Sequence, residues 1–124
     1  MSEGNRRVIL VDDDRDVLEL LSLVVARLGV SCETAATGEE AVELMRKRPA
    51  DLLILDKNLP GIDGLEAARR ARELQPGIPI ALVTGYESDE SRRAAAAIGI
   101  DDYIRKPIDL TDFRTRIGAL LPAA

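Results

Sequence analysis

Short apolar runs alternate with helix-like segments along the whole chain, and this alternation is the strongest constraint on the fold. Uninterrupted apolar residues fill 8–11, 52–55 and 80–83, which is the length of a buried strand. Strands that are apolar on both faces occur in parallel sheets that helices cover on both sides. The pattern therefore predicts an α/β fold around a parallel sheet.

Turn and capping residues divide the chain into five strands and five helices. We predict strands over 7–11, 31–35, 51–56, 80–83 and 102–104. The predicted helices cover 14–28, 37–48, 64–74, 88–98 and 110–121. Thr37 and Glu40 form a capping-box signature, and Gly29 and Gly99 are typical helix stops. Right-handed crossovers leave few topologies. We expect one doubly wound, flavodoxin-like (βα)5 domain over residues 1–124, with strand order 2-1-3-4-5.

The composition restricts the possible classes of function. The chain has 124 residues, 46% apolar and 31% charged, as in an ordinary soluble globular domain. Its net charge of −5 argues against a direct nucleic-acid partner. No apolar run reaches the length of a membrane span, and the short polar segment before Arg7 has no signal-peptide pattern. Cys32 is the only cysteine, which excludes an internal disulfide. Together these features predict a cytoplasmic protein.

The chain contains no histidine. Ser-His-Asp and Cys-His catalytic systems and His-ligated zinc sites are therefore excluded. Any chemistry must use carboxylates, hydroxyls, lysine and backbone groups. Oxygen ligands of this kind suit hard ions such as Mg²⁺.

Polar residues stand where the predicted strands end. The first strand is followed by Asp12 and Asp13, the third ends at Asp56, and the fourth and fifth precede Thr84 and Lys106. Sites in open parallel sheets form beyond the carboxyl ends of the strands. We therefore expect these side chains to meet at one edge of the sheet.

Three ionised carboxylates at one site repel one another, so the cluster requires a cation or added protons. A divalent ion together with Lys106 would bring it close to neutral. A carboxylate can act as a nucleophile and form an aspartyl phosphate. Phosphoryl transfer depends mainly on positioning and charge neutralisation, which Mg²⁺, Lys106 and the Thr84 hydroxyl can supply. The site thus favours phosphoryl acceptance at Asp56.

Each of these residues also has an ordinary interpretation. An Asp run after a strand is usually a solvated turn, and Asp14 is better placed to cap the first helix than to bind metal. Taken alone, Asp56 could cap a strand end, Thr84 could be a turn residue, and Lys106 could be a solvated lysine. The functional interpretation is favoured because the residues appear together, each after its own strand.

The chain resembles the receiver domain of two-component response regulators over nearly its whole length. The matching stretches are 11–14, 55–56 with 59–64, 83–85 and 99–107. The resemblance implies that Asp56 accepts a phosphoryl group from a phosphohistidine of a sensor histidine kinase or phosphotransfer protein. It implies that Asp13 binds Mg²⁺ directly, that Asp12 assists through water, and that the backbone carbonyl of Asn58 completes the protein ligands.

The resemblance also implies a switch. Lys106 pairs with the phosphoryl oxygens, while Thr84 and Tyr103 transmit phosphorylation to the surface of the fourth helix, fifth strand and fifth helix. Gly85 stands where Ala or Ser is common and leaves room for the phosphoryl group. By the same resemblance we expect a cis peptide bond between Lys106 and Pro107. The domain would be a signalling module that assists its own phosphorylation and dephosphorylation, not an enzyme.

The first predicted helix suggests where a kinase docks. We assign its sheet-facing stripe to Val17, Leu21, Val24 and Leu28. Leu18 and Val25 lie to one side of that stripe, and are either edge-of-core residues or a docking patch for a helical bundle. In the second case both side chains should be accessible to solvent.

Three other functions remain open. A flavodoxin-like FMN module would need a hydroxyl- and glycine-rich phosphate loop where Asp12, Asp13 and Asp14 stand, and aromatic residues are few. A metal-dependent phosphohydrolase with an aspartyl nucleophile would have a second acid at the position of Asn58. A degenerate receiver that only binds a partner would not need the Asp, Thr and Lys set. No output domain follows Leu121, so the chain is either a stand-alone receiver or part of a longer regulator or hybrid kinase.

Overall fold

The computed structural model describes residues 6–123, in which strands and helices alternate. The elements are β1 (Arg7–Val11), α1 (Arg15–Ala26), β2 (Ser31–Ala35), α2 (Gly38–Lys47), β3 (Leu52–Asp56), α3 (Gly64–Leu74), β4 (Ile80–Thr84), α4 (Asp89–Ile98), β5 (Asp102–Arg105) and α5 (Leu110–Leu120). No helix in this part of the chain is long and apolar enough to cross a membrane.

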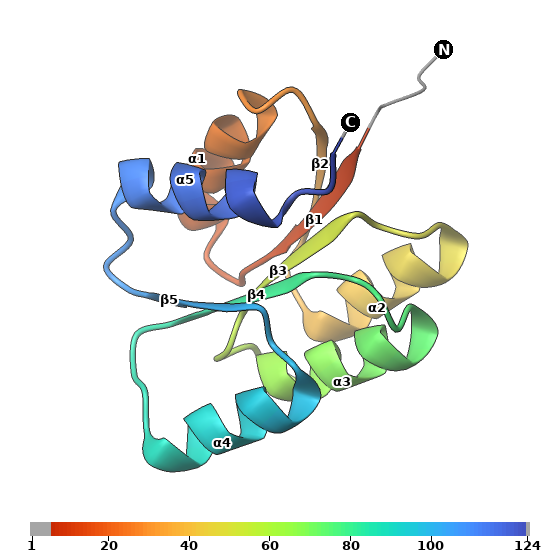
Figure 1. The fold of residues 1–124 in the computed structure, drawn as a ribbon, viewed down its shortest axis with the longest axis vertical. Helices are drawn as coiled ribbons and strands as arrows, with labels where there is room; N and C mark the ends of the chain where they lie inside the picture. Colours follow the sequence, from red (N-terminus) through yellow and green to blue (C-terminus); the bar gives the residue numbers. More distant parts are fainter. Residues whose placement is uncertain (1–5, 124) are drawn as a thin grey trace.

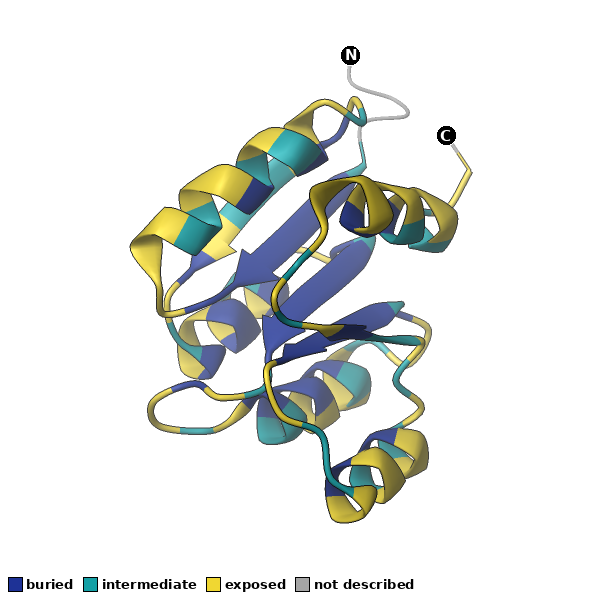
Figure 2. Ribbon diagram, turned by 90° about the vertical axis from the view of Figure 1, so that its left-hand side faces the viewer, coloured by how far each residue is buried: buried dark blue, intermediate teal, exposed yellow. Residues whose placement is uncertain are grey.

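The strands form one parallel sheet in the order β2-β1-β3-β4-β5, which confirms the predicted topology. Helices α1 and α5 cover one face, and α2, α3 and α4 cover the other (Figure 1). Every residue of β1, β3 and β4 is buried, as the uninterrupted apolar runs predicted. Figure 2 shows these strands as a buried layer between helices whose outer faces are exposed. The sheet is therefore a rigid platform whose strand ends position side chains.

Helix boundaries follow the capping residues. The side chain of Asp14 accepts hydrogen bonds from the backbone of Asp16 and Val17, and Thr37 caps α2 in the same way, so both predicted caps are confirmed. Helix α1 ends at Ala26, two residues before the predicted end. The N–H groups of Leu28 and Gly29 donate to carbonyls only three residues back, which tightens the last turn and ends the α-helix.

The predicted buried face of α1 is rotated from the observed one. The fully buried residues are Leu21 and Val25, at 2% and 0% exposure, whereas Val17 and Val24 are only half-buried. The docking-patch interpretation required Val25 to be accessible, and it is therefore wrong for this residue. Val25 lies one turn after Leu21 on the same face, and so both point at the sheet. Leu18 is half-buried and packs against the same core cluster.

Helix α5 packs against the core through only part of its apolar face. Phe113 and Ile117 are fully buried against the sheet, but Leu110 is 38% exposed. Leu110 is the first residue of the helix and projects beyond the edge of the core. The helix therefore contacts the core through its middle turns and leaves an apolar residue free at the end that faces Lys106.

Candidate functional site

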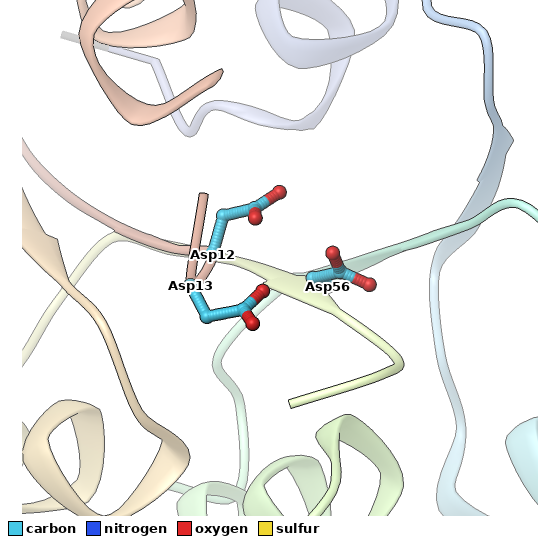
Figure 3. Close-up of side chains that lie close together, drawn as sticks. All are labelled: Asp12, Asp13 and Asp56. Atoms are coloured by element: carbon cyan, nitrogen blue, oxygen red, sulfur yellow. The ribbon is translucent and has the colours of Figure 1, made fainter. Parts of the chain in front are cut away.

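Strand register brings three carboxylates together at the carboxyl edge of the sheet. Val11 pairs with Leu55, so Asp12 follows β1 at the level where Asp56 ends β3. Carboxylate oxygens of Asp12, Asp13 and Asp56 lie within 4.8 Å of one another (Figure 3). Asp12 is 3% and Asp56 is 5% exposed, whereas Asp13 is exposed. The arrangement is an acidic cleft with two buried members and one that faces solvent.

Lys106 reaches into this cleft from the segment after β5. Its Nζ lies 2.8 Å from Asp56 Oδ2 and 3.4 Å from Asp12 Oδ2. The backbone N–H of Lys106 donates to the Thr84 carbonyl at 2.8 Å, which extends the ladder one residue past the strand. The Lys106–Pro107 peptide is cis, as expected. Four of the predicted residues, Asp12, Asp13, Asp56 and Lys106, therefore meet at one site.

The chain after Asp56 turns tightly and holds its carboxylate in place. The N–H of Asn58 donates to Asp56 Oδ1 at 2.9 Å, and the N–H of Lys57 donates to the Val83 carbonyl at 2.8 Å. Gly64 begins α3 directly against this turn, donating to the Lys57 carbonyl at 2.8 Å. A Cβ on Gly64 would lie 2.3 Å from the Asp56 carbonyl oxygen. Only glycine allows the helix to begin so close to the site.

Burial and like charge shape the electrostatics of the cleft. Burial raises the pKa of Asp12, the hydrogen bond from the Asp14 N–H lowers it, and the charge of Asp56 raises it further. Burial acts to lower the pKa of Lys106, but the hydrogen bonds to Asp56 and Asp12 and the charges of these two carboxylates together outweigh that effect, and the net pKa is raised. Three carboxylates and one ammonium leave two negative charges unbalanced. The cleft therefore carries the charge that a divalent cation neutralises.

The donor set fits a hard cation. All the side-chain atoms that converge here, apart from the Lys106 ammonium, are carboxylate oxygens, which Mg²⁺ and Ca²⁺ prefer. Mg²⁺ usually takes one or two carboxylates and keeps several waters. The exposure of Asp13 leaves one side of the cleft open to waters or to a phosphate.

Thr84 lies at the same edge, but its hydroxyl is engaged elsewhere. The side chain is 1% exposed. Its hydroxyl donates to the Tyr86 carbonyl at 2.6 Å and accepts from the Tyr86 N–H at 3.1 Å. A hydroxyl has one hydrogen to donate. In this structure that hydrogen is held by the β4–α4 turn and is not available to a group on Asp56.

Tyr103, the other predicted switch residue, lies on the neighbouring strand β5, paired with Leu82. Its hydroxyl oxygen is buried and has no hydrogen-bond partner among the described residues. The guanidinium of Arg92 lies 5.8 Å from the centre of its ring. Tyr103 and Thr84 are thus close to each other in the sheet without touching through a hydrogen bond.

Glu87 stands in the β4–α4 turn and was not among the residues predicted from the sequence. Its carboxylate lies 3.3 Å from Arg92 Nε on α4 and 3.6 Å from Arg105 Nη1 on β5. The side chain is only 16% exposed. A glutamate in a turn gives no periodic signal, and its partners are set by the packing of α4 against β5. No sequence pattern would have found it.

An apolar groove of about 450 Å³ lies between α1 and the segment after β5, next to the acidic cleft. Its lining includes Leu20, which is 48% exposed, Leu110 and Lys106. A second groove, between α1 and the end of β2, is lined by Leu18 and Asp13. The surface around the acidic cleft therefore offers apolar contacts as well as charge.

A family model for the response regulator receiver domain matches residues 8–118. The response regulator MprA of Mycobacterium leprae is 40% identical over 115 residues, covering 93% of this chain and 50% of that protein. The chain thus spans about half the length of the curated relatives it matches.

Solved structures agree with this match. A CheY-like receiver domain protein from Methanospirillum hungatei JF-1 is 31% identical, covers 93% of this chain and 92% of that chain, and has a TM-score of 0.89. The BeF3-activated DrrB receiver domain is 28% identical, covers 94% and 97%, and has a TM-score of 0.84. The chain therefore belongs to the family of response regulator receiver domains, the signalling domains of two-component systems.

Proposed function

We propose that residues 1–124 form one phosphoacceptor domain, in which Asp56 takes a phosphoryl group from a phosphohistidine of a sensor histidine kinase or phosphotransfer protein. The observation that carries this proposal is the position of Asp56. It is buried at a strand end, with Lys106 Nζ at 2.8 Å and two more carboxylates within 4.8 Å. This combination serves to hold and neutralise a phosphoryl group.

In the proposed reaction a carboxylate oxygen of Asp56 attacks the phosphorus of the phosphohistidine. A P–O bond forms, the P–N bond breaks, and its electron pair stays on the imidazole nitrogen. The N–H of Asn58 orients the attacking carboxylate, and Lys106 then pairs with the phosphoryl oxygens. No general base is required because the nucleophile is an ionised carboxylate. The domain in this way assists its own phosphorylation and dephosphorylation without being an enzyme for another substrate.

The residues suited to hold Mg²⁺ are Asp13 directly, Asp12 through water, Asp56, and the backbone carbonyl of Asn58. Bound Mg²⁺ supplies neutralisation of the charge on the phosphoryl oxygens. The protein's own part is to keep two carboxylates buried and one exposed around the acceptor.

Phosphorylation would then be read at a distance. We propose that Thr84 turns toward the phosphoryl group and that Tyr103 follows, which changes the surface of α4, β5 and α5. A downstream protein or an output domain of a longer regulator would recognise that surface. The proposed setting is the cytoplasm, with no direct contact to nucleic acid or membrane by this domain.

The phosphodonor protein would dock on the groove between α1 and the β5–α5 connection. Leu20 and Leu110 are exposed there beside Lys106, where a phosphohistidine must approach. Val25, proposed from the sequence for this role, is buried and plays no part in it. An amphipathic helix laid along the groove would bury both leucines.

Intact mass measured after incubation with Mg²⁺ and a small-molecule phosphodonor tests the phosphoacceptor. We expect a gain of one phosphate in the natural chain, none in Asp56→Asn, and an unchanged gain in Asp16→Asn, which alters an exposed acid on α1. A gain that persists in Asp56→Asn would refute the assignment. Steady turnover of a generic phosphate ester would instead favour the phosphohydrolase.

A further inference from the structure

The Thr84 hydroxyl has one hydrogen to donate, and in this structure that hydrogen is not available to a phosphoryl group. Its hydroxyl donates to the Tyr86 carbonyl at 2.6 Å. To donate to a phosphoryl oxygen on Asp56, Thr84 must first release that carbonyl. Whatever holds Tyr86 in place therefore opposes the contact between Thr84 and the phosphoryl group.

Glu87 is the residue that holds this turn. It follows Tyr86 directly, and its carboxylate pairs with Arg92 at 3.3 Å and Arg105 at 3.6 Å. Arg92 lies on α4, and Arg105 is the last residue of β5. Through Glu87, the turn at 85–88 is joined to both elements that flank it. The Glu87 side chain is 16% exposed, whereas those of Arg92 and Arg105 are 58% and 72% exposed, so each ion pair has one partner that is shielded from solvent.

The surroundings of Tyr103 provide a second observation, because its hydroxyl is poorly satisfied in this structure. The Tyr103 hydroxyl is buried and makes no hydrogen bond of good geometry, although the Ser91 side chain on α4 is near enough to lower its pKa, so this position of the ring leaves the hydroxyl poorly satisfied. Burial raises the pKa of Tyr103, and the charge of Glu87 raises it further, so Glu87 lies close enough to act on this ring. Arg92, one of the two partners of Glu87, lies over the same ring. One network thus holds both predicted switch residues in their present positions.

We propose that Glu87 is a positioning residue whose two ion pairs keep the 85–88 turn in the conformation that retains the Thr84 hydroxyl. It acts through Thr84 and sets how readily the domain accepts the phosphoryl group. This inference rests on the proposed role of Asp56 and adds the residue that restrains it.

Beryllium fluoride, added with Mg²⁺ as the phosphoryl mimic, provides the test. We expect Glu87→Ala and Glu87→Gln to bind it about threefold to tenfold more tightly than the natural chain, which is the size of effect expected for two ion pairs that share one shielded partner. Affinity for Mg²⁺ alone should not change. Glu66→Ala is the matched control, because Glu66 also pairs with two arginines, Arg69 and Arg70, but belongs to the first turn of α3 and not to the 85–88 turn. It should leave both affinities unchanged.

A double-mutant cycle separates this role from a general charge effect. Removing an anion near the cleft could strengthen binding of beryllium fluoride through electrostatics alone, and that gain would persist with Thr84→Ala. If Glu87 acts through Thr84, the gain from Glu87→Ala disappears in the Thr84→Ala background. Persistence of the gain, or equal binding by Glu87→Ala and the natural chain, overturns the inference. A natural chain that binds Mg²⁺ but no beryllium fluoride would overturn the proposed function as well.

Discussion

The sheet buries charge at both of its ends, but only one of the two clusters is balanced. At the amino end Arg7 is 6% exposed, and its guanidinium pairs with the Glu33 carboxylate. The same guanidinium donates to the carbonyls of Leu44, Arg48 and Pro49 where α2 ends. Each guanidinium nitrogen has a partner, and the charge is matched by one carboxylate.

At the carboxyl end, Asp12, Asp13 and Asp56 share one lysine, and two negative charges are left over. A buried charge that is fully paired is accommodated by the fold, whereas buried charges of one sign without enough partners lower the free energy of unfolding. The charge of the Arg7 cluster is balanced, whereas the acidic cleft keeps two negative charges that a divalent cation would neutralise. The unbalanced cluster is the candidate for function, and the balanced Arg7 cluster is the one that serves the structure.

The largest effect on stability is expected from removing the Arg7 guanidinium, whose hydrogen-bonding groups are all paired. Arg7→Met would leave three carbonyls and a carboxylate without their donor and should lower the free energy of unfolding by about 3 kcal/mol. Urea denaturation with a chelator present measures this. Mg²⁺ should raise the stability of the variant and of the natural chain by the same amount, because the proposed metal site is at the other end of the sheet.

Arg46→Met is the control for that experiment, since Arg46 is an exposed arginine on α2 with one ion pair, to Glu43. Its effect should stay within about 0.5 kcal/mol. Comparable losses from the two variants would show that the Arg7 cluster is not a special structural element.

The next largest effect on stability is expected from binding of Mg²⁺ to the acidic cleft. Mg²⁺ at a hundred times its dissociation constant should raise the free energy of unfolding by about 2.7 kcal/mol. Asp13→Ala should lose this increment. Asp14→Ala should keep it and lose only the helix cap, about 1 kcal/mol. If Asp14→Ala abolishes the response and Asp13→Ala preserves it, the roles of these neighbours are reversed.

The sequence sufficed for the topology because its signals are local and agree with one another. Apolar runs mark the central strands, and Asp14 and Thr37 mark helix starts by chemistry that does not depend on the rest of the fold. Acidic residues after successive strands could be placed together because parallel strands end at one edge. The meeting of Asp12, Asp13, Asp56 and Lys106 follows from that rule.

The orientation of single groups could not be predicted in the same way. Apolar residues occur around most of α1, so a rotation of the helix that buries Val25 in place of Val24 leaves the pattern equally good. The commitment of the Thr84 hydroxyl to Tyr86 depends on the conformation of one turn. Glu87 depends on how α4 packs against β5. These features are set by tertiary contacts, which periodicity and spacing do not describe.

The smallest effect concerns the surplus charge itself, through the raised pKa of Asp12. An acid whose pKa is higher in the folded state binds its proton more tightly there, so its contribution to stability falls as pH rises from about 4, near its ordinary value of 3.8. Asp12→Asn keeps the oxygen that accepts from the Asp14 N–H but removes the charge. Without Mg²⁺ this variant should exceed the natural chain in stability by about 1 kcal/mol at neutral pH, and by less near pH 4. Saturating Mg²⁺ should cancel the advantage by balancing the carboxylates. Urea denaturation at both pH values, with Asp16→Asn as an exposed control, measures the difference. A difference in the free energy of unfolding that does not change with pH would show that the ionised Asp12 carboxylate does not destabilise the folded state.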